Sequence, residues 1–118
     1  MEQGEGEPMN NQLISSSMPI SETAYYILMS LVDVRHGYGI IQYVEDLTDG
    51  RIRLGAGTVY GSLSRMEKDG LIRIVAVEDR RKLYQLTKAG ADLLKSEIAR
   101  IKEMYEHSKK VEDALGWE

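Results

Sequence analysis

The sequence predicts a mainly α-helical protein with one small β-hairpin, and three observations support this prediction. Apolar residues recur at steps of three and four in four segments, which is the spacing of amphipathic helices. Two short runs rich in branched residues follow the third segment, and each is typical of a strand. Between these runs lies a polar turn, 78–82, with three adjacent cations. Helix, strand, basic tip and strand is the order of a winged helix.

Each of the four expected helices has its own start or stop signal. The first spans 21–32 with Ser21 as its N-cap, and the second spans 38–47 before a Thr-Asp-Gly turn. The third spans 58–69 and ends at Gly70. Thr87 is the expected cap of a last helix over 88–115, which is long for a small globular domain.

The two strands of the hairpin are expected over 71–77 and 82–86. Residues 51–54 alternate polar and apolar side chains, so they predict either a short strand or an extended lead-in to the third helix. The Gly-Ala-Gly run at 55–57 gives the backbone freedom to turn sharply into that helix.

Three regions follow from this order of elements. Residues 1–18 show little periodicity, so they predict a flexible N-terminal arm. Residues 19–87 are expected to form the winged helix-turn-helix domain. Residues 88–118 are expected to form a long C-terminal dimerisation helix.

Composition excludes several classes of site. A chain of 118 residues is expected to form one domain with a single modest core. The chain has no cysteine, so it has no disulfide and no thiolate metal site, and this fits a reducing cytoplasm. No apolar run reaches the length of a membrane span. The two histidines are far apart in sequence, so we expect no metal site, and nothing suggests a cofactor.

The distribution of charge is more informative than the net charge of −4. Residues 1–50 hold one cation and eight acidic groups. Residues 51–88 hold nine cations against four acidic groups, whereas 89–118 hold five against seven. Cations gathered in one segment predict an electrostatic contact with nucleic acid that the total conceals.

The third helix and the basic turn are the candidate contact surface for double-stranded DNA. Val59, Leu63 and Met66 form an apolar stripe for the core, which leaves a polar and basic face for a partner. At the start of the second helix, free amides and the helix dipole favour a phosphate. The residues expected to contact DNA are His36, Tyr38, Thr58, Tyr60, Ser64, Arg65, Lys68, Arg80, Arg81 and Lys82.

Each of these residues also has a simpler interpretation. The basic turn is otherwise a solvated hairpin tip, and the third helix then shows a solvated face. Tyr60 could belong to the core, while His36 and Tyr38 could serve only a helix cap and ordinary packing. Arg51 and Arg53 could touch the DNA backbone or remain solvated.

The last helix carries apolar residues at alternating steps of three and four, which is the pattern of a seam for another helix. With Tyr25 of the first helix, this seam is the expected dimer contact. Tyrosines of the first and last helices could instead line a ligand cavity. The residues expected at the dimer contact are Tyr25, Leu94, Ile98, Ile101, Met104, Tyr105, Val111 and Leu115.

Five short motifs in order resemble the PadR family of bacterial transcriptional regulators. They are Tyr-Ile-Leu at 26–28, His-Gly-Tyr-Gly-Ile at 36–40, Gly-Thr-Val-Tyr at 57–60, Leu-Ser-Arg-Met-Glu-Lys-Asp-Gly-Leu-Ile at 63–72, and Tyr-Gln-Leu-Thr-Lys-Ala-Gly at 84–90. The resemblance covers residues 20–95 and is specific in combination. It implies a winged helix-turn-helix, a homodimer formed through the terminal helices, and repression of a nearby promoter. Some members release DNA when a small aromatic or drug-like ligand binds.

The chain departs from the family pattern at two places. The family often has proline directly after the tyrosine of the third helix, whereas this chain has Gly61. Short members with a drug-binding pore carry tryptophan inside the last helix. Here the only tryptophan is Trp117, one residue from the end, so that ligand site is not transferred.

The sequence predicts a dimeric, sequence-specific DNA-binding repressor with operator DNA as its partner, and two other functions are alternatives. A winged-helix protein-interaction module without direct DNA binding fits the acidic remainder of the chain. An enzyme ranks far below, because the sequence has no nucleophile–base pair, glycine-rich phosphate loop or metal cluster at usable spacing.

Overall fold

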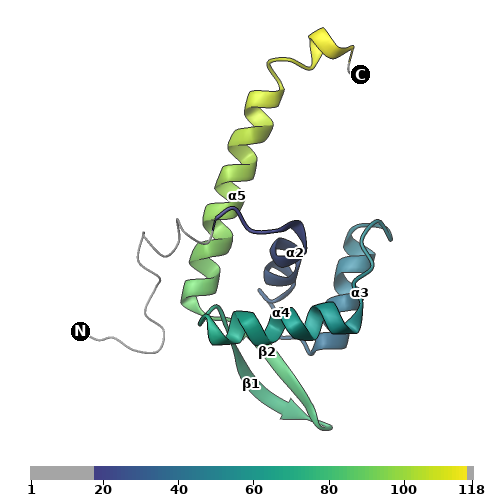
Figure 1. Cartoon of the computed structure of the whole chain (residues 1–118), viewed down its shortest axis with the longest axis vertical. Helices are drawn as coiled ribbons and strands as arrows, with labels where there is room; N and C mark the ends of the chain where they lie inside the picture. The colour runs from purple at the N-terminus through teal and green to yellow at the C-terminus, as the bar shows by residue number, and fades with distance from the viewer. Residues whose placement is uncertain (1–17, 117–118) are drawn as a thin grey trace, which may run out of the picture.

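The computed structural model describes residues 18–116. Four α-helices and one antiparallel hairpin form the fold (Figure 1). Their bounds in chain order are α2 Glu22–Ser30, α3 Gly37–Leu47, α4 Ala56–Lys68, β1 Ile72–Glu78, β2 Arg81–Leu86 and α5 Lys88–Ser108, followed by the short 3₁₀ helix η1 Asp113–Leu115. The expected mainly α-helical winged-helix fold with a long C-terminal helix is confirmed. The sequence expectations for residues 1–17 and for Trp117 lie outside the described part.

Side chains placed just before three helices explain where those helices begin. The hydroxyl of Ser21 accepts the amide of Ala24 at 3.0 Å, and the hydroxyl of Thr87 accepts that of Gly90 at 3.1 Å. At α3 the cap is an imidazole, that of His36. These acceptors satisfy amides that have no partner within the first turn of a helix.

The core lies where α2, α3, α4, the hairpin and the first half of α5 meet (Figure 1). Val59, Leu63 and Met66 of α4 are buried in it, as their spacing predicts. The other buried apolar residues are Ile27, Leu28, Leu31, Ile40, Val44, Leu71, Ile72, Tyr84, Ala89, Leu93 and Leu94. One core therefore unites the base of α5 with the helices before it.

The α2–α3 connection adds a third extended segment to the hairpin. Arg35 and Tyr84 exchange two main-chain hydrogen bonds, with the Arg35 amide at 3.1 Å and the Tyr84 amide at 2.8 Å from the opposite carbonyl. No local pattern signals this pairing, because the two residues are far apart in the chain. Residues 51–54 do not form a strand. Of the two predicted alternatives, the extended lead-in to the third helix is therefore correct.

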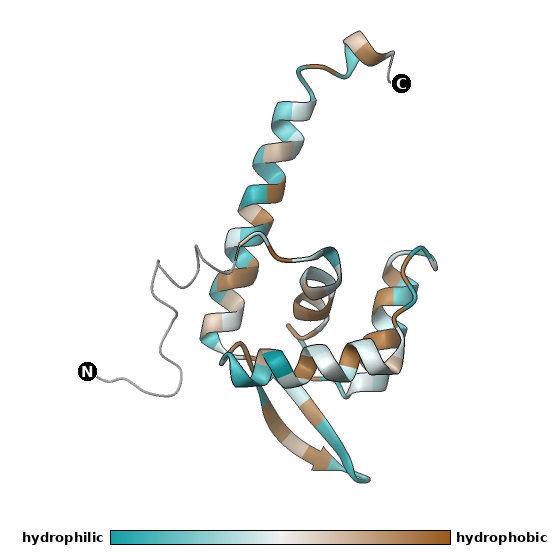
Figure 2. Ribbon diagram, viewed as in Figure 1, coloured by the Kyte–Doolittle hydropathy of each residue, from teal (hydrophilic) through white to brown (hydrophobic). Residues whose placement is uncertain are grey.

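The last helix is shorter than expected. It ends at Ser108 instead of 115, and its buried positions stop at Glu97. The hydroxyl of Ser108 donates to the carbonyl of Tyr105 at 2.6 Å. This side chain therefore provides a partner for one of the carbonyls in the last turn of the helix. Beyond Glu97, α5 extends away from the other helices while still carrying apolar residues along its length (Figure 2).

Candidate nucleic-acid interface

The hairpin turn is tighter than the sequence suggested. Its two central residues, Asp79 and Arg80, have φ values of 51° and 67°. Positive φ at both positions is the geometry of a type I′ turn, whose twist matches that of the strands. Arg81 and Lys82 therefore belong to β2, whereas the sequence placed Arg81 in the turn. Because successive side chains of a strand alternate between faces, these two cations point to opposite sides of the hairpin.

The exposed face of α4 is polar and basic, as predicted. Thr58, Ser64, Arg65 and Lys68 are all exposed, with the two cations near the C-terminal end of the helix. The helix begins at Ala56, so only Gly55 of the Gly-Ala-Gly run remains outside it. Gly61 lies within regular helix, and no other group fills the space beside it.

Tyr60 is neither core nor fully solvated, with 48% of its surface exposed. Its ring lies against the start of α3, where a Cβ on Gly37 would come within 2.5 Å of the ring. Gly37 therefore permits the close approach of α3 and α4. Tyr84 is buried, and this burial raises the pKa of its phenol, with the charges of Glu67 and Tyr60 adding to the effect.

His36 and Arg81 meet although 45 positions separate them. Nδ1 of His36 accepts the amide of Gly39 at 3.2 Å as the cap of α3. A neutral imidazole has only one acceptor nitrogen, so Nε2 then carries the hydrogen. This Nε2 lies 3.3 Å from a guanidinium nitrogen of Arg81, which can only donate. In this tautomer two donors converge at one point, and an acceptor such as a phosphate oxygen would satisfy both.

Tyr38 extends this group at the start of α3. Its ring stacks beside that of His36, with centroids 6.5 Å apart and planes 14° from parallel. The side chain of Tyr38 is exposed. Its phenol therefore stands beside the two converging donors and adds a hydroxyl to the same surface.

Two arginines before α4 have partners within the chain. Arg51 lies 3.1 Å from Glu22, and Arg53 lies 3.6 Å from Glu45. The hydrogen bond to Glu22 is the main cause that raises the pKa of Arg51. Both pairs are exposed, so they contribute little to stability. They do, however, reduce the positive field of these arginines relative to the hairpin cations.

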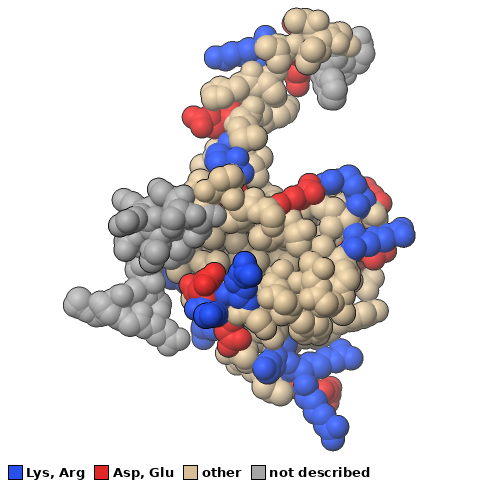
Figure 3. Space-filling model, in the orientation of Figure 1, with Lys and Arg blue, Asp and Glu red and all other residues tan. Residues whose placement is uncertain are grey.

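Figure 3 shows Lys and Arg at the tip of the hairpin and over α4, where acidic groups lie beside them, and also near the end of α3 and along α5. The cations of α4 and the hairpin tip are Arg65, Lys68, Arg80, Arg81 and Lys82. The structure thus brings the hairpin, α4 and the start of α3 together on one part of the molecule.

The expected dimer residues divide into two groups. Leu94 is buried in the core of its own chain, and Tyr25 and Ile98 are partly buried. The others are exposed, including Met104 at 53% and Tyr105 at 58%, and those within α5 lie beyond the last buried position. Val111 and Leu115 follow the end of α5 and are not part of the same helix.

A cavity of about 430 Å³ lies between α2 and α5. Glu97, only 1% exposed, accepts two hydrogen bonds from Arg100 at 2.9 and 3.1 Å inside it. These bonds raise the pKa of Arg100. Tyr25 and Tyr26 contribute an edge-to-face aromatic pair to the same cavity. Burial raises the pKa of Tyr25, with smaller contributions from Tyr26 and Glu97.

Comparison with known proteins decides the family. The model of the transcriptional regulator PadR-like family matches residues 27–96. The chain belongs to the PadR-like family of transcriptional regulators. This confirms the resemblance drawn from the five motifs, and members of the family are regulators rather than enzymes.

Individual relatives agree with this family. The PadR-like chain is 35% identical over 81 residues to an uncharacterized 37.1 kDa protein in transposon TN4556 of Streptomyces fradiae, and 31% identical over 77 residues to the transcriptional regulator YqjI of Escherichia coli. These matches cover 68% and 65% of this chain but only 23% and 37% of the two relatives. The chain therefore spans well under half the length of either one.

Solved structures share the architecture. A PadR-like transcription factor from Bacteroides fragilis is 29% identical with a TM-score of 0.66, and the match covers 84% of this chain and 98% of that one. A PadR family regulator from Clostridium difficile is 27% identical with a TM-score of 0.58, covering 80% and 98%. Across residues 18–116 of the PadR-like chain, no helix is both long and apolar enough to cross a membrane.

Proposed function

We propose that this PadR-like protein is a dimeric repressor that binds double-stranded operator DNA. In the proposed complex α4 lies in the major groove, and the hairpin holds the flanking phosphates. The observation that carries this proposal is the convergence of His36 Nε2 and Arg81 on one point beside the exposed face of α4. Two donors without an acceptor between them suit a phosphate oxygen.

The proposal predicts a strong dependence of affinity on salt, because each neutralised phosphate releases counterions. Changing Arg80, Arg81 and Lys82 together to Ala is expected to weaken binding to every duplex and to lower the salt slope by about 2 to 3 per bound chain. Fluorescence anisotropy with labelled duplexes over a salt series measures both effects. Footprinting on DNA upstream of the protein's own gene provides the specific duplex.

A matched variant separates the hairpin cations from general charge. Lys95, Lys102 and Lys109 changed together to Ala remove the same charge from α5 and the residue that follows it. We expect this variant to keep most of the salt slope. Equal loss in the two variants would rule out the hairpin as the phosphate contact.

Dimerisation through α5 is part of the proposal. Ile101, Met104 and Tyr105 form an exposed apolar stripe beyond the last buried residue of the helix. Spacings of three and four place them on one face, and a second copy of the chain would cover them. The two-fold symmetry would set half-sites about one turn of DNA apart.

A small aromatic effector is the third part of the proposal. The cavity between α2 and α5 offers Tyr25 and Tyr26 for ring contacts and the Arg100–Glu97 pair for a polar group. Thermal-shift screening with phenolic compounds and hydrophobic cations, followed by a DNA-release assay, tests it. A compound that stabilises the protein and releases DNA would support the proposal, whereas the absence of any such compound would argue for another signal.

A further inference from the structure

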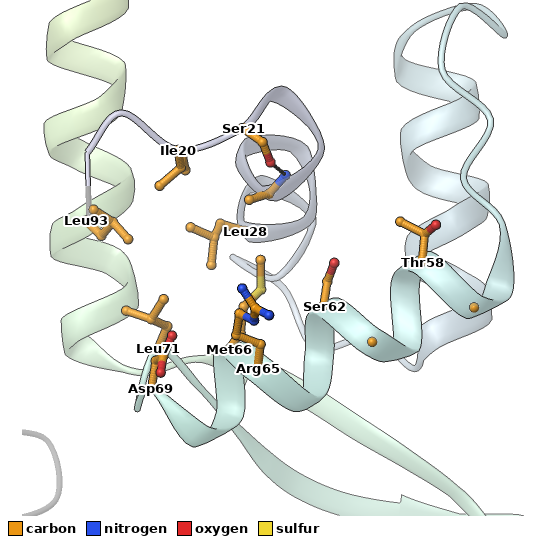
Figure 4. Close-up of a pocket in the computed structure, with 13 residues that line it drawn as sticks. Ile20, Ser21, Leu28, Thr58, Ser62, Arg65, Met66, Asp69, Leu71 and Leu93 are labelled. Carbon is orange, nitrogen blue, oxygen red and sulfur yellow. Dashed lines mark hydrogen bonds between the residues drawn. The ribbon is translucent and has the colours of Figure 1, made fainter. Parts of the chain in front are cut away.

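A groove of about 610 Å³ runs beside α4, between this helix, the start of α2 and the base of α5 (Figure 4). Its floor is apolar and comes from four different parts of the chain. The floor residues are Ile20, Ala24, Leu28, Met66, Leu71 and Leu93. Of these, Leu28, Met66, Leu71 and Leu93 also belong to the buried core.

The rim of the groove is polar and overlaps the proposed DNA surface. Thr58, Ser62, Arg65 and Asp69 of α4 line one side of it. Figure 4 shows the Arg65 guanidinium directed toward the space between α4 and α2. Thr58 and Arg65 are also on the exposed face of α4 that is proposed to meet DNA. An occupant of the groove would therefore compete with DNA for these two residues.

The chemistry of the groove matches residues 1–17 of the same chain. This segment contains Glu2, Glu5 and Glu7 but no Lys or Arg, so its side chains carry a formal charge of −3. It also contains the apolar residues Met9, Leu13 and Ile14. Apolar side chains suit the floor of the groove, and carboxylates suit the Arg65 guanidinium, while Asp69 places one carboxylate on the same rim.

The connection to the fold favours this occupant over a separate molecule. Ile20 and Ser21 line the groove, so the segment enters the described fold at the groove itself. A coil of about 13 residues, the separation of Glu7 from Ile20, has a root-mean-square span of about 20 Å. Such a tether gives an effective concentration on the order of millimolar. At this concentration, contacts that are individually weak are enough for the segment to occupy the groove.

We propose that residues 1–17 dock in the groove between α2, α4 and α5 and compete with duplex DNA for Thr58 and Arg65. The docked segment is an acidic, autoinhibitory arm. Its consequence for DNA rests on the proposed function, whereas the docking itself does not.

Docking is tested by disulfide trapping, which the chain suits because it has no cysteine of its own. The full-length variant Glu7→Cys/Ser62→Cys places one thiol in the segment and one in the groove. We expect it to form an intrachain disulfide about tenfold faster than Glu7→Cys/Glu103→Cys, whose second thiol is on exposed α5. Equal rates, or disulfides mainly between chains, would overturn the docking.

Competition is tested with a labelled generic duplex at low salt. Glu2→Gln/Glu5→Gln/Glu7→Gln is expected to bind about three- to tenfold more tightly than the control Asp46→Asn/Asp49→Asn/Glu103→Gln, which changes net charge equally. Ser62→Leu, which fills the groove, is expected to abolish this difference. Equal affinities of the two triple variants would overturn autoinhibition. No DNA binding by any variant would instead refute the proposed function, and the disulfide rates would still decide the docking.

Discussion

Two glycines show how the surroundings of a residue set the role of the same amino acid. A Cβ on Gly90 would clash with the carbonyl oxygen of Leu71. Only glycine therefore allows the first turn of α5 to pack this closely against the backbone at Leu71. Gly61 has nothing within 4 Å of the same position and has ordinary helical geometry. Gly90 is thus needed for packing, whereas Gly61 is not.

These surroundings predict opposite effects of one substitution. Gly90→Ala is expected to lower the free energy of unfolding by about 3 kcal/mol, because backbone must move to relieve the contact. Gly61→Ala is expected to raise it by about 0.5 to 1 kcal/mol, because alanine favours a helix over the unfolded chain. Urea unfolding of the two variants checks the pair, and a stable Gly90→Ala protein would contradict the close approach.

His36 has one task for each ring nitrogen, so substitutions can separate them. Asparagine also caps helices well, so His36→Asn is expected to preserve stability while losing the Nε2 donor. DNA affinity should then fall about tenfold, the value of one hydrogen bond to a charged group. His36→Ala should lose about 1 kcal/mol of stability as well. Thermal unfolding and anisotropy measure the two effects; unchanged DNA affinity in His36→Asn would exclude the phosphate contact.

At the scale of elements, Thr87 joins the end of α4 to the start of α5. Its hydroxyl donates to the carbonyl of Gly70 at 2.6 Å and accepts the amide of Gly90 at 3.1 Å. Gly70, with a φ of 78°, ends α4, and the amide of Leu71 bonds back to Met66 at 2.9 Å. One side chain therefore fixes the angle at which α5 leaves the domain.

This double role predicts a larger effect than an ordinary cap. Thr87→Ala is expected to lower the free energy of unfolding by about 2 kcal/mol, the upper end of the range for a cap, because the Gly70 carbonyl also loses its partner. Thr87→Ser keeps both hydrogen bonds and is the matched control. Chemical denaturation followed by circular dichroism compares them, and equal stability of the two variants would contradict the bridging role.

The elements also show what local sequence can and cannot predict. Helix starts at Ser21 and Thr87 were predictable because a cap acts within three residues. The end of α5 was not, since a seam-like spacing of apolar residues continues past the point where the helix stops at Ser108. Arg81 was assigned to the turn because the sequence does not reveal that Asp79 and Arg80 alone can close it.

At the scale of the whole molecule, α5 has two parts with different surroundings. As far as Ile98 it is anchored in or against the core, and beyond that residue its apolar side chains are exposed. Exposed apolar groups on a helix that leaves the domain are typical of an interface. This division motivates the proposed dimer.

The proposed dimer predicts that a charge on this stripe separates the chains. Met104→Glu is expected to shift the protein from dimer to monomer and to weaken DNA binding by more than about tenfold, since one half-site contact is lost. Lys102→Glu, an exposed change on the same helix, is the control. Sedimentation velocity gives the mass. A Met104→Glu protein that remains dimeric would place the interface elsewhere.

The sequence by itself determined the winged-helix order, the family and the cationic segment, because periodicity, caps and charge are properties of neighbours along the chain. Tertiary structure alone decided that His36 meets Arg81, that Arg35 pairs with Tyr84, and that a groove borders α4. Each joins residues that are distant in sequence, and such contacts depend on how the core packs. The winged helix was therefore predictable, whereas the point where two of its donors converge was not.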